Sequence, residues 1–227
     1  MNVDPSPILI SMRTASLAIL ITFFLGIMAA RAVMALRSAK LRVVLDSLLT
    51  LPLVLPPTVA GFFLLYIFGV RRPVGKFLLD FFSWKIAFSF SATVLAAVVI
   101  SFPLMYRSAR AAFQQVDQNL IYAARTLGMP EGRIFWHIVM PLSRPGVAAG
   151  GVLAFARGLG EFGATAMIAG NIAGKTRTLP LAVYSQVAGG NMEAAYQYVA
   201  ILVAICFVVV AAMSYFAAKE NRYRQRT

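Results

Sequence analysis

Acidic residues, histidine and cysteine are scarce in this chain of 227 residues, and their scarcity excludes most kinds of catalytic and metal site. The chain has eight Asp and Glu residues, one histidine (His137) and one cysteine (Cys206). A single cysteine forms neither an intrachain disulfide nor a CxxC metal site. One His, one Cys and no paired carboxylates also leave an intramembrane enzyme without a nucleophile and base. We therefore expect a non-catalytic chain that binds no metal.

Charged residues are also few, while apolar residues dominate. Hydrophobic residues make up 60% of the chain and charged residues 13%, whereas soluble domains are about 45–50% apolar and about 25% charged. The 21 Lys and Arg residues give a formal net charge of +13. In a soluble protein this excess would suggest nucleic acid as a partner, but in a membrane protein it is typical of cytoplasmic loops. We therefore predict a membrane protein that does not bind nucleic acid.

Apolar runs long enough to cross a bilayer predict an all-α polytopic protein. A helix needs roughly 20 mostly apolar residues to cross a hydrocarbon core of about 30 Å. The predicted spans are, approximately, residues 10–30, 44–69, 86–106, 145–169 and 196–218. The apolar run 178–190 is too short and too rich in glycine to cross, so we expect a packed helix there. The chain shows no internal repeat and no linker, which predicts a single domain over residues 1–227.

The basic residues predict the orientation of these spans. Alternate connections of a five-span protein lie on one side of the membrane, and here they are residues 31–43, residues 107–144 and the C-terminal tail. These three segments carry 13 of the 21 Lys and Arg residues, which predicts an external N-terminus and a cytoplasmic C-terminus by the positive-inside rule. The four basic residues between positions 71 and 85 are a counter-signal, because they lie on the other side.

The connection 107–144 is much longer than a turn requires and has helical patterning of its own. Asp117 is suited to begin a helix, and Gly128 with Pro130 is suited to end it; a second short helix is expected from Glu131 to Ile138. The small residues Ala123 and Ala124 allow close approach by another backbone, so the first helix fits a groove on a partner protein. An amphipathic helix lying on the lipid surface is the alternative.

Residues in this connection resemble the cytoplasmic motif of ABC importer permeases, E-A-A-x3-G-x9-I-x-L-P. The spacing agrees at every step, although Tyr122 replaces the Glu and Met140 replaces the Leu of the motif. The coupling residues that this resemblance implies are Tyr122, Ala123, Ala124, Arg125, Leu127, Gly128, Ile138 and Pro141. Further segments, at 51–61, 101–105, 123–128, 153–164 and 176–180, resemble molybdate permeases of the ModB type in the same order, so that the resemblance covers about residues 10–218.

This resemblance implies the transmembrane domain of a type I ABC importer, with about five transmembrane helices and a cytoplasmic coupling helix. It also implies a homodimer in the bacterial inner membrane, two ATP-binding subunits, and a solute-binding protein that delivers molybdate or tungstate. Sulfate or thiosulfate is the alternative substrate. We expect ATP and Mg on the ATPase, because the Walker-like stretch 69–77 has five residues between its glycines and Phe77 where Ser or Thr is required.

Several residues in and beside the spans are candidates for the pore or its gate. Prolines and glycines interrupt helices where the backbone is enclosed in protein or lines a cavity, although ordinary kinks are the alternative. Arg157 and Glu161 are four residues apart on one helix face, so we expect them to pair; Arg157 is the better candidate for the anion pathway, because a carboxylate repels an anion. The candidates are Pro56, Pro57, Arg157, Gly160, Glu161, Phe162 and Gly163.

Outside the membrane, Lys175 and Arg177 lie in a glycine-rich turn. Their charge is suited to steering an anion or binding an acidic surface of a solute-binding protein, and a solvated loop is the alternative.

A stand-alone secondary anion carrier is the competing class of protein. Such a carrier usually has intramembrane acids or histidines, or repeat symmetry. Glu161 is the only intramembrane acid that we singled out, and no repeat is present. Copurification with an ATPase subunit would separate the two classes.

Overall fold

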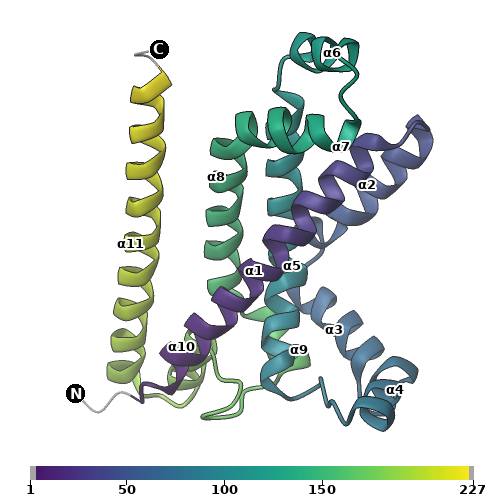
Figure 1. Ribbon diagram of the computed structural model, residues 1–227. Helices are drawn as coiled ribbons and strands as arrows, with labels where there is room; N and C mark the ends of the chain where they lie inside the picture. Colours follow the sequence, from purple (N-terminus) through teal and green to yellow (C-terminus); the bar gives the residue numbers. More distant parts are fainter. Residues whose placement is uncertain (1–3, 225–227) are drawn as a thin grey trace.

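The computed structural model describes residues 4–224, and side chains as far as residue 212; over this range all the regular elements are helices (Figure 1). In chain order these elements are α1 (Ser6–Ala35), α2 (Ala39–Val54), α3 (Pro57–Phe68), α4 (Pro73–Phe82), α5 (Phe90–Gln114), α6 (Gln118–Thr126), α7 (Glu131–Ile134), the π-helical turn η1 (Phe135–Val139), α8 (Met140–Leu159), α9 (Gly163–Ile168), α10 (Leu179–Ala188) and α11 (Met192–Arg224).

Helices α1, α5 and α8 form the centre of the fold, and small residues allow them to approach closely. Between α1 and α5, buried hydroxyls form hydrogen bonds, 2.8 Å for Thr14 with Thr93 and 3.3 Å for Thr22 with Ser101. Between α5 and α8, Ser143 Oγ donates to the Ala112 carbonyl oxygen over 3.1 Å. Such close contacts and interhelical hydrogen bonds stabilise helix pairs inside a membrane, where apolar burial alone gives little preference for protein over lipid.

Within the described residues, four helical stretches are long and apolar enough to cross a membrane, and the number is five if the bent pair α2 and α3 is one span. The four are Ser6–Ala35, Phe90–Gln114, Glu131–Leu159 and Met192–Ala212. This agrees with the predicted all-α class and with about five spans.

The predicted second span, 44–69, is not one straight helix. Helix α2 ends at Val54, α3 begins at Pro57, and the two are bent by 112°. Leu55 and Pro56 between them have extended backbone, with ψ of 140° and 133°. Proline has no amide hydrogen and disfavours helical geometry in the residue before it, so consecutive prolines at 56 and 57 end one helix and start another.

The predicted fourth span, 145–169, was wrong at both ends. The helix begins earlier, because η1 continues α7 into α8 and Pro141 and Pro145 are accommodated within α8. It ends at Leu159, and α9 follows separately after Gly160. The segment on both sides of the break is apolar apart from Glu161, so hydropathy alone did not locate the helix end at Leu159.

The predicted third span and the connection after it also differ from the structure. Helix α5 extends from Phe90 to Gln114 instead of stopping near residue 106. Arg107 and Arg110 end the apolar run, but they do not end the helix. The predicted connection 107–144 therefore shortens to residues 115–130 between α5 and α7, and α6 fills most of it.

The alternate connections lie at one end of the molecule, as predicted. Figure 1 shows α6, the α1–α2 connection and the C-terminal end of α11 at one end, with the N-terminus, α4 and α10 at the other. The basic tail positions that contributed to the prediction, Lys219, Arg222, Arg224 and Arg226, lie outside the described side chains.

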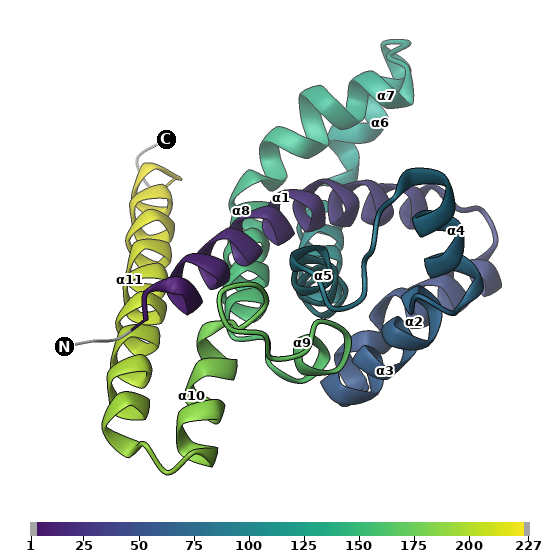
Figure 2. The same ribbon diagram turned by 90° about the horizontal axis from the view of Figure 1, so that it is seen from below.

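Helix α10 is packed, as expected for the run 178–190. Leu179, Leu181 and Ala182 are buried, and the Leu179 amide donates to Ser11 Oγ of α1 over 2.7 Å. Helix α11 runs beside α10, away from α5 (Figure 2), with most of its described side chains exposed.

The packing of α3 on α9 predicts a specific sensitivity at Gly61. A Cβ atom at Gly61 would lie 2.6 Å from the Ala164 Cα atom and 2.8 Å from its carbonyl oxygen, both of which are backbone. We expect Gly61→Ala to lower the free energy of unfolding by about 1–3 kcal/mol, measured as a fall in the thermal unfolding midpoint of the purified protein.

Gly158→Ala is the matched control, because the nearest atom to its added Cβ would be Ala97 Cβ at 3.7 Å. This helical substitution should leave the midpoint unchanged or raise stability by up to about 1 kcal/mol. Equal midpoints for the two variants would contradict the close contact at Gly61.

Candidate functional site

Helix α6 lies at one end of the molecule (Figure 1). A capping residue begins it and a glycine follows its C-terminus. The Asp117 carboxylate accepts a hydrogen bond of 2.9 Å from the Asn119 amide, which caps the N-terminus. Gly128 follows the helix with a φ of +72°, a conformation that favours glycine. The predicted first helix of the connection is therefore present.

The two alanines of α6 point in different directions. Ala123 is exposed, whereas Ala124 is buried and belongs to the hydrophobic cluster that also contains residues of α1, α5 and α7. Tyr122 and Leu127 are also exposed, at 56% and 81%. The predicted coupling residues therefore divide into an outward group, which offers a partner small and apolar side chains, and Ala124, which attaches the helix to the core.

An ion pair fixes the end of α6 to α7. Arg125 Nε lies 2.6 Å from Glu131 Oε1, and Arg125 Nη2 lies 3.2 Å from Glu131 Oε2, a bidentate arrangement. Hydrogen bonding to Glu131 raises the pKa of the Arg125 guanidinium above its ordinary value. Because both side chains are exposed, the pair adds little to stability. Its effect is to orient α6 relative to α7.

Ile138 and Pro141, the remaining predicted coupling residues, lie away from the outward group. Ile138 is half-buried in η1, and Pro141 is half-buried in the first turn of α8. In η1, Phe135 packs edge-on against Phe113. The Arg31 guanidinium carbon lies over the Phe135 ring, 4.5 Å from its centroid. Ile138 and Pro141 therefore do not form part of the exposed surface of α6.

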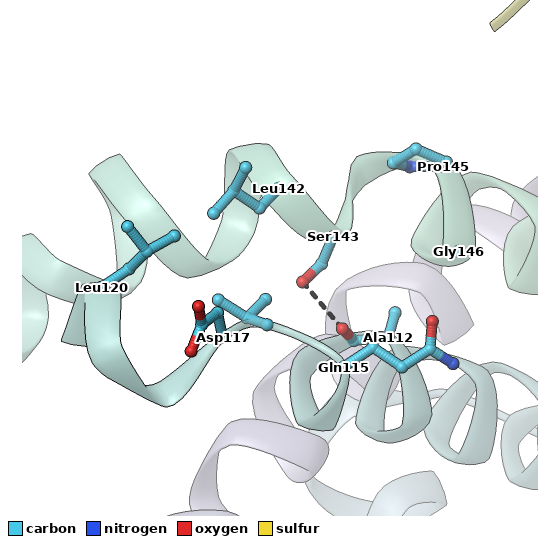
Figure 3. Close-up of a pocket in the computed structure, with 9 residues that line it drawn as sticks. Ala112, Gln115, Asp117, Leu120, Leu142, Ser143, Pro145 and Gly146 are labelled. Atoms are coloured by element: carbon cyan, nitrogen blue, oxygen red, sulfur yellow. Dashed lines mark hydrogen bonds between the residues drawn. The ribbon is translucent and has the colours of Figure 1, made fainter. Parts of the chain in front are cut away.

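Two hollows border α6. One, of about 270 Å³, lies between the end of α5, the start of α6 and α8, with Asp117 and Leu120 on one side and Leu142 and Ser143 on the other (Figure 3). The second, of about 550 Å³, is lined by Arg31, Arg37, Arg125 and its partner Glu131, together with Gln118 and apolar residues. A partner that covers α6 thus meets a basic surface beside it.

The structure brings the two predicted gate segments together. Helices α3 and α9 pack side by side, and a Cβ atom at Gly163 would lie 3.0 Å from Pro57 Cβ. Pro56 and Gly160 are exposed at the ends of this contact. Phe162 is half-buried, with its ring centroid 5.3 Å from that of Tyr184 on α10.

Arg157 and Glu161 form the predicted pair, across the break between α8 and α9. Arg157 Nη1 lies 2.9 Å from Glu161 Oε2, and Glu161 Oε1 accepts a hydrogen bond of 2.7 Å from the Ala164 amide. The Glu161 side chain is 2% exposed and that of Arg157 is 32% exposed. A buried carboxylate is strongly unfavourable unless it is paired, and here Arg157 and the α9 amide are its two partners, while the Arg157 side chain stays partly accessible.

The predicted docking residues lie in the turn before α10. Lys175 is exposed, and Arg177 is half-buried with its Nε donating to Asn171 Oδ1 over 2.8 Å. The turn is closed by the Ile172 carbonyl, which accepts from the amides of Lys175, Thr176 and Arg177. It is therefore an ordered loop that presents positive charge at the end of the molecule opposite α6.

One polar cluster was missed by sequence reasoning. Asp46 of α2 accepts a hydrogen bond of 2.7 Å from the Tyr106 hydroxyl and forms an ion pair with Arg110, both of α5. Glu161 is therefore not the only intramembrane acid that deserved notice, because Asp46 lies inside the predicted span 44–69. An acid in an apolar run was the available signal, but its partners are 60 and 64 residues away in sequence.

Comparisons with known proteins agree on one family. The family described as "Binding-protein-dependent transport system inner membrane component" matches residues 22–222. The molybdenum transport system permease protein ModB of Escherichia coli (strain K12) is 47% identical over 190 residues, which are 83% of this chain and 82% of that protein. The putative molybdenum transport system permease protein YvgM of Bacillus subtilis (strain 168) is 40% identical over 205 residues, 90% of each chain.

Among solved structures, a chain of the MetNI methionine ABC transporter in inward-facing conformations has the same fold. Its TM-score to this chain is 0.74 with 15% sequence identity, and the alignment covers 94% of both chains.

We expect Arg157→Ala to abolish solute uptake, because it removes a cation from the α8–α9 break and leaves the buried Glu161 carboxylate without a counter-charge. Uptake of a radiolabelled oxyanion into vesicles that contain normal amounts of the protein measures this.

The double variant Arg157→Met with Glu161→Gln separates the two causes. If the only role of Arg157 is to neutralise Glu161, the double variant should transport normally. We expect the double variant to remain inactive, since the cation itself is lost. Normal uptake by the double variant would show that Arg157 is not needed in the anion pathway.

Proposed function

This chain belongs to the family of binding-protein-dependent transport system inner membrane components, and we propose that it forms the membrane pore of an ATP-driven importer of molybdate. It is a multi-pass membrane protein and a permease subunit, a dimeric membrane component that works with an ATPase and a binding protein. The observation that supports molybdate as the substrate is the 47% identity to a molybdenum transport permease over most of both chains.

The complete assembly that we propose contains two copies of this chain, two ATP-binding subunits and a solute-binding protein loaded with molybdate or tungstate. Sulfate or thiosulfate is less well supported, because the relatives with the highest identity are molybdenum transport permeases. In this proposal ATP and Mg bind to the ATPase subunits, and the chain itself supplies no catalytic residue and no cofactor or metal site.

We place the assembly in the bacterial inner membrane, with α6 in the cytoplasm and the N-terminus outside. The end that carries α6 also carries Arg31, Arg37 and Arg125 around one hollow, and basic residues accumulate in cytoplasmic loops. In this orientation the C-terminal end of α11 is cytoplasmic, and Lys175 and Arg177 face outward, where a binding protein would dock.

The proposed coupling begins with α6 in a cleft of the ATPase. Its exposed residues, among them Tyr122, Ala123 and Leu127, would form the contact, while the basic hollow meets acidic groups beside that cleft. Helix α6 packs on α7 and η1, which continue into α8, so a displacement of α6 would be passed to α8. Rigid-body movement of this kind is one way to alternate access between two sides of a membrane.

Within the membrane, we propose that the contact of α3 with α9 forms the gate and that Arg157 faces the anion pathway. Its guanidinium remains about one-third exposed while it pairs with Glu161. A delocalised cation with several donors suits a tetrahedral oxyanion. Glu161 would hold the arginine in position and would not contact the anion.

ATP hydrolysis by the reconstituted complex tests the substrate. Binding protein loaded with molybdate should stimulate hydrolysis strongly, tungstate should do so comparably, and sulfate should have little effect. The ATPase assay on proteoliposomes with each loaded protein in turn measures this. Stimulation by sulfate alone would assign the chain to sulfate transport, and ATP-independent uptake with no copurifying ATPase would identify a secondary carrier.

The division of α6 into exposed and buried alanines predicts opposite behaviour for neighbouring substitutions. Ala123→Arg should leave thermal stability unchanged and abolish ATP-driven uptake, because it places a long charged side chain in the ATPase contact. Ala124→Arg should instead destabilise the permease itself, since Ala124 is 3% exposed. Thermal unfolding and copurification of the ATPase measure both effects. An Ala123→Arg complex that still transports would place the ATPase contact elsewhere.

A further inference from the structure

Helix α4 connects the end of α3 to the start of α5 and lies at the end of the molecule opposite α6 (Figures 1 and 2). Its first residue, Pro73, suits the first turn of a helix. Its last turn ends at Ser83, which has a left-handed φ of 50°. The flanking helices α3 and α5 are both apolar, so α4 connects two segments that are suited to the hydrocarbon.

The orientation of α4 is fixed by its contact with the end of α3. A Cβ atom at Gly75 would lie 2.2 Å from the Gly69 carbonyl oxygen and 2.5 Å from that of Phe68, so only glycine allows this approach. Leu78 also packs against the core cluster formed by α3, α5 and α9. One face of α4 is therefore buried, and the direction of its other faces is set by the fold.

The outward apolar face of α4 is aromatic. Phe77, Phe81 and Phe82 are 52%, 74% and 66% exposed, and the ring centroids of Phe77 and Phe81 lie 4.7 Å apart. Trp84 follows, 51% exposed, with its indole Nε1 donating to Ser91 Oγ over 3.0 Å. Side chains with an apolar ring and a satisfied polar group are characteristic of membrane–water interfaces.

Basic residues surround this aromatic face. Arg71, Arg72, Lys76 and Lys85 are exposed, whereas Asp80 is the one acid of α4. The Arg72 guanidinium lies 4.1 Å from the centroid of the Tyr66 ring on α3. In the proposed orientation with the N-terminus outside, these residues lie on the side where the positive-inside rule expects few Lys and Arg residues. The rule therefore does not explain their presence.

We propose that α4 is an interfacial helix that is seated in the outer leaflet, with its aromatic face at the headgroup–acyl boundary and its cations on anionic lipid headgroups. Three observations agree on this partner: an apolar face with no partner in the fold, adjoining cations, and a position between the ends of two spans. A helix with this composition lies in the plane of the interface, and each basic residue near an anionic surface adds to its attraction. The inference concerns the bilayer and does not depend on which anion is transported.

Spin labels on two faces of α4 test the proposal in the full complex. Cys206 is the only cysteine of the chain, so Cys206→Ser gives a background for Phe81→Cys and, as the matched control, Lys76→Cys on the polar face. The labelled complexes are reconstituted in vesicles of phosphatidylcholine and phosphatidylglycerol, and relaxation by oxygen and by water-soluble NiEDDA is measured.

The label at position 81 should be relaxed by oxygen far more than by NiEDDA, and the label at position 76 should show the reverse. Strong relaxation of both labels by NiEDDA would place α4 in water and overturn the proposal. Protection of position 81 from both reagents would also overturn it, because the face would then be covered by a second copy or by the binding protein.

The role of the cations is tested by the lipid composition. In vesicles of phosphatidylcholine alone, the label at position 81 should shift toward the aqueous phase. Arg71→Gln with Lys85→Gln should cause the same shift in the mixed vesicles and remove the response to phosphatidylglycerol. An identical label position in both lipids would overturn the contribution of anionic headgroups.

Discussion

A backbone that leaves helical geometry inside a membrane must find its hydrogen bonds within the protein, because hydrocarbon offers none. The backbone of this chain leaves helical geometry at two places within the predicted spans, between α2 and α3 and between α8 and α9. At the second break the Glu161 carboxylate receives the Ala164 amide, and Arg157 provides the counter-charge. Gly61 and Gly163 then allow the helices that follow the two breaks to pack against each other. The position of every gate candidate depends on this arrangement.

The break between α8 and α9 is also the C-terminal end of a long helical stretch. A continuous helical stretch of 29 residues extends from Glu131 to Leu159, and it remains continuous because η1 takes up an extra residue in its turn. One end is tied to α6 by the Arg125–Glu131 pair, and the other end carries Arg157. One continuous helical stretch therefore connects Glu131, the partner of α6, with Arg157, one of the gate candidates.

Sequence reasoning succeeded where the signal was local. The spacing of Asp117 and Gly128 located α6, and the separation of four residues predicted the pair of Arg157 with Glu161. It failed where tertiary contacts decide the outcome. Hydropathy did not locate the end of α8 at Leu159, and Arg107 and Arg110 end an apolar run within a continuing helix. Ala124 is buried in a cluster whose other members lie elsewhere in the sequence. The partners of Asp46 on α5 were beyond reach for the same reason.

In the proposed anion pathway, the pair of Arg157 with Glu161 has a consequence for an anion that passes it. A lone guanidinium in a low-dielectric passage would create a deep electrostatic minimum, and a divalent anion would leave it slowly. Because the carboxylate lies 2.9 Å from the guanidinium, the two charges form a dipole whose attraction weakens quickly with distance. Conduction requires attraction that is strong enough for entry and weak enough for exit. In the proposed pathway, a neutral pair with one accessible cationic side would give the passage a shallow minimum, which favours turnover over retention.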